Sequence, residues 1–249
     1  MIIRISLVFF SILLPVSHTV KLRVKRDFMY VADGNGTDTD CYQKCNDKHR
    51  HDFEFSLNMS LADFYDFPFH PLVLKHSSYL LYCKLADQRT KCYQSECGDL
   101  SADTVFSPSN FVCNFKRSHF SEVRTCLAEA EPITFLKCDQ QCHQKLRNTK
   151  KAAQFFSTNS LDAYEVELDD LCSFQSCYMA CMEPVVMEIC PRSIASSAVS
   201  LVKTLVEWHA ADVADWHTVT GREDQLPESC KRLSGAASPD PILQIISRA

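Results

Sequence analysis

Fourteen cysteines are the residues of this chain whose chemistry can be argued most directly. A thiolate acts as a nucleophile or binds a metal, and two thiols oxidise to a disulfide. Three pairs of cysteines are four residues apart: Cys41 with Cys45, Cys138 with Cys142, and Cys177 with Cys181. On a helix, this spacing places both residues on one face, so each pair can tie its helix twice to a neighbour. The C-x-x-C spacing of zinc ribbons and thioredoxin-like sites does not occur, so we predict disulfides, with no metal site and no catalytic cysteine.

An even set of cysteines in an exported protein is most simply seven disulfides, although spacing alone does not give the pairing. The predicted disulfide cysteines are Cys41, Cys45, Cys83, Cys92, Cys97, Cys113, Cys126, Cys138, Cys142, Cys172, Cys177, Cys181, Cys190 and Cys230. Seven precede residue 130 and seven follow it. Two pseudo-repeated halves are therefore one prediction, and an unrepeated domain is the alternative.

Two histidines in one predicted helix, His209 and His217, are the best candidates for hidden catalysis. His209 and Asp212 share a helix face, whereas His217 is rotated about 80° from His209, which is poor geometry for a metal triad. The adjacent Trp208 and Trp216 favour a helix that packs into the core. The sequence motifs of serine hydrolases, P-loop NTPases and zincins are absent. We therefore predict that the chain is not an enzyme and has no catalytic residue, metal ion or cofactor.

Two clusters of charge have a simpler explanation than chemistry. The acidic run at residues 162–170 could supply paired carboxylates, and the basic cluster at residues 143–151 could touch a sulfated polysaccharide. Charged residues at helix ends are commonly solvated, so we predict that both clusters are solvated helix ends.

Four positions are candidates for covalent modification. Asn35 and Asn58 each begin an N-x-[ST] sequon for N-glycosylation. Ser234 precedes Gly235 and is a candidate for glycosaminoglycan attachment, although few acidic residues flank it. Arg26 ends a basic cluster of the kind that processing proteases cut after.

The elements that must position these residues are helices. The chain has five glycines in 249 residues, which argues against a turn-dense β-sandwich, and runs of alternating apolar and polar residues are rare. Hydrophobic spacing predicts helices at residues 39–51, 72–85, 121–129, 132–147, 161–182 and 193–220. We therefore predict an all-α, disulfide-stapled helical domain.

The N-terminal residues have the layout of an export signal. Residues 1–19 place one arginine before an apolar run and end in small or polar residues, as a signal peptide does. We predict a propeptide at residues 20–26, a flexible acidic linker at 27–40, the cysteine-rich helical domain at 41–233 and a disordered tail at 234–249. No apolar run is long enough to span a bilayer, so we expect no membrane span.

Charge excludes one class of partner. The first 26 residues hold five basic and no acidic residues, which leaves 21 basic and 31 acidic residues in the remainder, a net charge of −10. Binding to nucleic acid depends on clustered positive charge, so we expect no nucleic-acid partner.

Four segments of the chain, taken in order, match a pattern known from one family: residues 115–117 after a cysteine, 134–143, 171–181 and 208–217. Together they resemble the nematode secreted domain called chondroitin proteoglycan 4, over about residues 41–233. The resemblance implies an extracellular, disulfide-rich domain, in some members part of a chondroitin-bearing core protein of matrix or eggshell, with no catalytic residues to carry over. This chain departs from a proteoglycan core by having one Ser-Gly dipeptide rather than a serine-glycine-rich region.

These observations predict a secreted, extracellular and non-catalytic protein that acts in the matrix or as an interaction domain, with matrix proteins or glycans as partners. Two alternatives stay open. A secreted helical carrier would use the 16 phenylalanines to line a large apolar cavity for a lipid or small ligand. A secreted enzyme of unrecognised type would need His209 or His217 beside a carboxylate at the mouth of a cleft. The sequence does not indicate an oligomeric state.

Overall fold

The computed structural model describes residues 39–64, 67–104, 107–145 and 161–234. The predicted signal peptide, the propeptide with Arg26, the linker with Asn35 as far as residue 38, and the tail beyond Ser234 lie outside the described residues. Across the described part of the chain there is no strand, so the predicted all-α class is confirmed.

The described chain is a succession of helices. Its α-helices are α2 (Thr39–Leu57), α3 (Pro71–Leu74), α4 (His76–Glu96), α5 (Pro108–Asn110), α6 (Arg117–Thr134), α7 (Gln140–Lys145), α8 (Leu161–Ile189), α9 (Arg192–Val219) and α10 (Glu228–Ser234). Two π-helical turns, η2 (Phe111–Phe115) and η3 (Phe135–Asp139), and two 3-10 turns, η1 (Leu61–Asp63) and η5 (Glu223–Gln225), complete the set.

The predicted helix boundaries agree best with the structure where a proline or glycine in the sequence marks the end of the helix. The helix predicted at 193–220 is α9, which starts just after Pro191 and stops before Gly221, a glycine with a φ of 68°. The helix predicted from residue 132 is not separate, because Pro132 lies within α6 and the chain continues through η3 into α7. α2 begins at Thr39, two residues inside the predicted linker, and α10 ends at Ser234, the first residue of the predicted tail.

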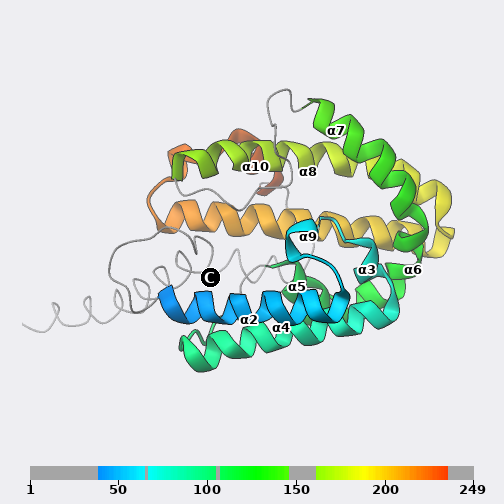
Figure 1. Ribbon diagram of the computed structural model, residues 1–249. Helices are drawn as coiled ribbons and strands as arrows, with labels where there is room; N and C mark the ends of the chain where they lie inside the picture. Colours follow the sequence, from blue (N-terminus) through cyan, green and yellow to red (C-terminus); the bar gives the residue numbers. More distant parts are fainter. Residues whose placement is uncertain (1–38, 65–66, 105–106, 146–160, 235–249) are drawn as a thin grey trace, which may run out of the picture.

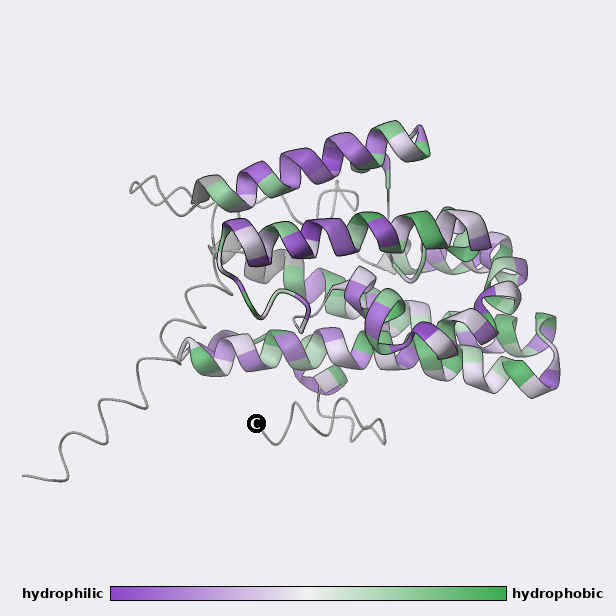
Figure 2. Cartoon of the chain, turned by 90° about the horizontal axis from the view of Figure 1, so that it is seen from below, coloured by the Kyte–Doolittle hydropathy of each residue, from purple (hydrophilic) through white to green (hydrophobic). Residues whose placement is uncertain are grey.

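The helices form two groups that pack on each other. Figure 1 shows α2 and α4 side by side along the lower edge, with α8, α9 and α10 above them. α6 packs against both α8 and α9, and α3 contacts both α4 and α6. Hydrophilic and hydrophobic residues are interleaved along the helices (Figure 2). Among the described helices, none is both long enough and apolar enough to cross a membrane.

One aromatic core runs through both groups. Phe120 of α6 is fully buried, and its ring centroid lies 5.0 Å from those of Phe69 and Tyr79. Trp208 of α9 is also buried, as predicted, with its ring 5.6 Å from Phe111 and 4.8 Å from Phe115. Contacts of this kind stabilise the fold beyond the area they bury.

Replacing this tryptophan tests its packing role. We expect Trp208→Ala to lower the free energy of unfolding by about 3 kcal/mol, because it removes a large buried side chain and leaves a cavity. Leu100→Ala is the control, since Leu100 is 82% exposed and its loss should change stability by less than about 0.5 kcal/mol. Equilibrium denaturation measures both variants, and equal small effects would contradict the core assignment.

All fourteen cysteines pair in seven disulfides. The double ties predicted for the C-x-x-x-C pairs are present. Cys41 and Cys45 of α2 join Cys97 and Cys92 at the end of α4, and Cys138 and Cys142 join Cys181 and Cys177 of α8. The other three disulfides are Cys83–Cys113, Cys126–Cys190 and Cys172–Cys230.

The two halves share one disulfide order. In each half the first cysteine pairs with the fifth and the second with the fourth, and the third, on the same helix as the fourth, pairs with a cysteine further along the chain. Cys126–Cys190 is the link between the halves. A common order of pairing on two antiparallel helix pairs supports the two pseudo-repeated halves that the sequence allowed.

Candidate functional site

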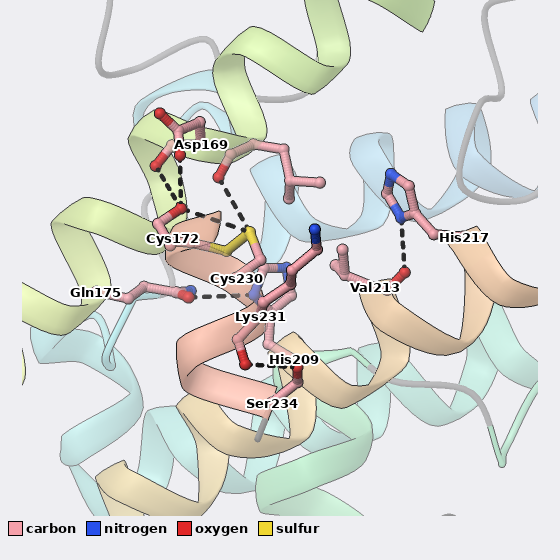
Figure 3. Close-up of a disulfide and its surroundings, with 11 residues drawn as sticks. Asp169, Cys172, Gln175, His209, Val213, His217, Cys230, Lys231 and Ser234 are labelled. Atoms are coloured by element: carbon pink, nitrogen blue, oxygen red, sulfur yellow. Dashed lines mark hydrogen bonds between the residues drawn. A yellow bond between two sulfur atoms is a disulfide. The ribbon is translucent and has the colours of Figure 1, made fainter. Parts of the chain in front are cut away.

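The two histidines that the sequence singled out do not form a reactive pair. Nδ1 of His209 lies 3.1 Å from Oε1 of Gln175 on α8, and Nδ1 of His217 lies 2.8 Å from the carbonyl oxygen of Val213, one turn back on α9. His217 is fully buried, and its ring meets Trp216 edge-on at 4.8 Å. Figure 3 shows His209 turned toward Gln175 and His217 bonded back to its own helix. These two hydrogen bonds join α9 to α8 and α9 to its own preceding turn.

Burial gives His209 a measurable effect on stability. Burial lowers the pKa of His209 from 6.5 to about 4, so the folded protein keeps this ring neutral where the unfolded chain is protonated. Stability is therefore fully present above pH 6.5 and declines as the pH falls from about 6.5 toward 4. We expect this residue to account for a loss of about 2 kcal/mol between about pH 7 and pH 5.

Denaturation over this pH range in the wild type and in His209→Gln measures that contribution. Glutamine keeps a hydrogen-bonding group and does not titrate, so the variant should lose about 2 kcal/mol less than the wild type on acidification. Identical pH dependence of the two proteins would show that His209 is protonated as readily in the folded state as in the unfolded state.

The start of α10 is fixed against α8. Cys230 is joined to Cys172, and the Ser229 hydroxyl donates a hydrogen bond of 2.7 Å to Oδ1 of Asp169. Ser234, the candidate attachment serine, is the last residue of α10, and its hydroxyl donates to the carbonyl oxygen of Lys231 at 3.1 Å (Figure 3). Ser234 is partly exposed, so it lies at the protein surface where α10 ends.

An open groove lies between α2 and α4. Its volume is about 710 Å³, and we call it the α2–α4 groove. It is lined by Lys44, Lys48, Gln88, Lys91, Cys92, Gln94, Ser95 and Glu96. These residues include three lysines and one carboxylate.

The three lysines of the groove are exposed and form weak ion pairs. Nζ of Lys48 lies 2.6 Å from Asp52, Nζ of Lys91 lies 2.7 Å from Asp87, and Nζ of Lys44 lies 4.0 Å from Glu96. The lysine side chains are 67–75% exposed. Exposed pairs of this kind contribute about 0–1 kcal/mol each to the stability of the fold.

Beside the groove lies a small hollow of about 20 Å³, lined in part by His49, Asp52 and Arg89. Burial, and secondarily the charge of Arg89, lowers the pKa of His49 to about 3, so this ring is neutral in the folded protein. A hollow of this size is comparable to one water molecule and is too small for an organic ligand.

The carrier alternative requires a large enclosed apolar cavity. Two hollows along the described helices are the open α2–α4 groove and the very small one beside His49. The phenylalanines that such a carrier would use contribute instead to packed aromatic contacts, such as Phe53 on Phe64 at 5.0 Å and Phe67 on Tyr178 at 5.6 Å.

Of the predicted modification sites, Asn58 and Ser234 lie in the described chain. Asn58 is exposed at the end of α2 and has a φ of 51°. Residues 162–170 lie in the first turns of α8, and residues 143–145 lie in α7, whereas the rest of the basic cluster, at 146–151, lies outside the described residues. Sequence reasoning missed the groove, since the only signal for it was the i, i+4 spacing of Lys44 and Lys48.

The described fold defines the class of the protein: an all-α domain cross-linked by seven disulfides, with an aromatic core and a surface groove lined in part by lysines. The chain belongs to the family described as "Uncharacterized protein B0403.3", whose model matches residues 41–247. No curated protein and no solved structure matches the chain. The family description names no chondroitin proteoglycan, so that part of the expectation stays a proposal.

Proposed function

We propose that this protein is a secreted, non-catalytic domain of the extracellular matrix that binds sulfated glycans, and that it resembles a chondroitin proteoglycan core-protein domain. One observation carries the proposal: all fourteen cysteines are paired, and they tie two similar helix pairs into one unit. Disulfides persist in oxidising compartments and are rare in the cytosol, which supports export. A heavily cross-linked domain suits a protein that must keep its shape outside the cell.

The α2–α4 groove is the proposed contact for the glycan. Sulfated polysaccharides present rows of negative groups, and the groove presents three lysines whose present ion pairs are weak and exposed. The neighbouring glutamines and serine offer hydrogen-bond donors and acceptors to sugar hydroxyls. Binding through such charges should weaken as salt concentration rises.

Binding to immobilised chondroitin sulfate tests the proposal. The triple variant Lys44→Gln, Lys48→Gln, Lys91→Gln should bind about tenfold more weakly than the wild type, because each lost charge contact is worth about 0.5 kcal/mol. The matched control is Lys137→Gln, Lys203→Gln, Lys231→Gln, which removes three exposed lysines from other elements. No binding by the wild type, or equal loss in both variants, would refute the groove as a glycan site.

Whether the protein itself carries chondroitin is a separate question, and Ser234 is the candidate attachment residue. Intact mass of the secreted protein before and after chondroitinase treatment decides it. A fall in mass that disappears in Ser234→Ala supports a proteoglycan, whereas an unchanged mass leaves a matrix-binding protein without its own chondroitin chain.

A further inference from the structure

Phe55 is the most exposed of the large hydrophobic side chains in the described chain, at 84%. It lies in the last turn of α2, and none of the described rings packs on it. The other phenylalanine of this turn, Phe53, is buried against Phe64. A single exposed apolar residue is ordinary on a protein surface, so the position of Phe55 matters more than its exposure.

That position is three residues before Asn58, the first residue of the sequon Asn58-Met59-Ser60. Asn58 follows the last residue of α2 and has a φ of 51°, in the left-handed region that asparagine adopts more readily than most residues. Its side chain is exposed. The turn that ends α2 therefore presents the acceptor asparagine to solvent.

The chain after the sequon folds back on α2, which fixes this turn. The backbone N–H of Leu61 donates to Oε1 of Glu54 at 3.1 Å, and that of Asp63 donates to the carbonyl oxygen of Ser60 at 3.1 Å. The ring of Phe64 then packs on Phe53 of α2. Because both sides of the turn are held, Phe55 and Asn58 keep a fixed relation to each other.

Phe55 lies in the last turn of α2 and Asn58 is the first residue after that helix, so their backbones are separated by about one helical turn. A sugar on the amide nitrogen of Asn58 would therefore begin within reach of the Phe55 ring. The apolar C–H face of N-acetylglucosamine can pack on the electron-rich face of an aromatic ring, which loses little conformational freedom on contact.

We propose that Phe55 is the stacking platform for the first N-acetylglucosamine of an N-linked glycan on Asn58. Attachment joins Nδ2 of Asn58 to C1 of the sugar, while the C1–O bond to the pyrophosphate of a lipid-linked oligosaccharide breaks and one amide proton is released. The inference rests on the export that the proposed function requires. It does not depend on glycan binding in the α2–α4 groove.

Thermal unfolding of three glycoforms tests the platform. The full chain is exported from a eukaryotic host that adds high-mannose glycans, and it is studied intact, after endoglycosidase H, which leaves one N-acetylglucosamine, and after N-glycosidase F, which leaves none. Phe55→Ala should lower Tm by about 2–4 °C in the first two forms and leave it unchanged in the third. The control Leu100→Ala removes a similarly exposed side chain and should shift Tm equally in all three forms.

Three results would overturn the inference, and each is separable from failure of the proposed function. If Phe55→Ala shifts Tm equally in all three glycoforms, the Phe55 ring does not contact the sugar. If Phe55→Ala lowers Tm of the intact glycoform but not of the form treated with endoglycosidase H, the ring contacts a sugar beyond the first N-acetylglucosamine. If mass spectrometry finds no glycan on Asn58 of the exported chain, Asn58 is not a glycosylation site and the inference is wrong. If the chain is not exported at all, the proposed function itself is refuted.

Discussion

Reduction of the seven disulfides is expected to abolish the cooperative unfolding transition of this protein. The disulfides close loops of 30 to 64 residues, and a single loop of this range stabilises a fold by roughly 3–4 kcal/mol. The net stability of a domain is only about 5–15 kcal/mol, so losing all seven exceeds what the core can offset. Far-UV circular dichroism during thermal unfolding, with and without a strong reductant, measures the result.

The starting material and the control are well defined. Before reduction, alkylation of the denatured protein should label no cysteine, because all fourteen are paired. Removing the reductant and reoxidising slowly should restore the transition, which separates loss of cross-links from chemical damage. A reduced protein that keeps a sharp transition at the same temperature would contradict the dependence of this fold on its disulfides, and with it the main support for export.

The sequence predicts helices best where local signals are strong. Pro191 and Gly221 bracket α9, so both ends were predicted to within a residue or two. The predicted end of α4 near residue 85 was too early, because the last turns of α4 are held from outside: Tyr93 packs on Tyr42 at 5.2 Å, and Cys92 is bonded to α2. Tertiary contacts of this kind leave no mark on local hydrophobic spacing.

The extent of α8 shows the same limit. Its predicted end at residue 182 precedes Pro184, which removes one backbone hydrogen bond and normally argues against a helix. The structure continues α8 to Ile189, and Val185 and Val186 are buried in the core. Burial of these side chains, and the tie from Cys190 to Cys126 just beyond, offset the cost of the proline.

The α2–α4 groove depends on information that one helix does not contain. Lys44 and Lys48 share a face of α2, which the sequence shows, but Lys91 joins them only because Cys45 pairs with Cys92 and sets the two helices face to face. The sequence predicted that the C-x-x-x-C pairs staple helices twice, yet not which helices. Once the pairing is known, the lysine cluster follows from helix geometry.

Among single disulfides, loss of Cys172–Cys230 is expected to destabilise the protein most. The two cysteines are 58 residues apart, and no other disulfide joins two points within that loop. A loop of this length gives about 4 kcal/mol by the loop-entropy treatment. Both cysteines are fully buried, so the variant Cys172→Ala with Cys230→Ala also leaves a cavity.

Cys41–Cys97 provides the matched comparison, because its sequence separation is nearly the same at 56 residues. Cys45–Cys92 lies within that loop and already holds α2 to α4, so Cys41–Cys97 closes a path of only about nine residues. The same treatment then gives about 2.5 kcal/mol. Nested cross-links should therefore matter less than isolated ones of equal span, and Cys41 and Cys97 are also only partly buried.

Cys83–Cys113, whose cysteines are 30 residues apart with no shorter path between them, should fall between the two at about 3.5 kcal/mol. Equilibrium denaturation of the three double-alanine variants under non-reducing conditions measures the order. Sequence separation alone predicts equal losses of stability for the variants lacking Cys41–Cys97 and Cys172–Cys230. The nested arrangement predicts instead that loss of Cys41–Cys97 is the smallest of the three. If the variant lacking Cys41–Cys97 loses as much stability as the one lacking Cys172–Cys230, the constraint on the unfolded chain is not what these disulfides contribute.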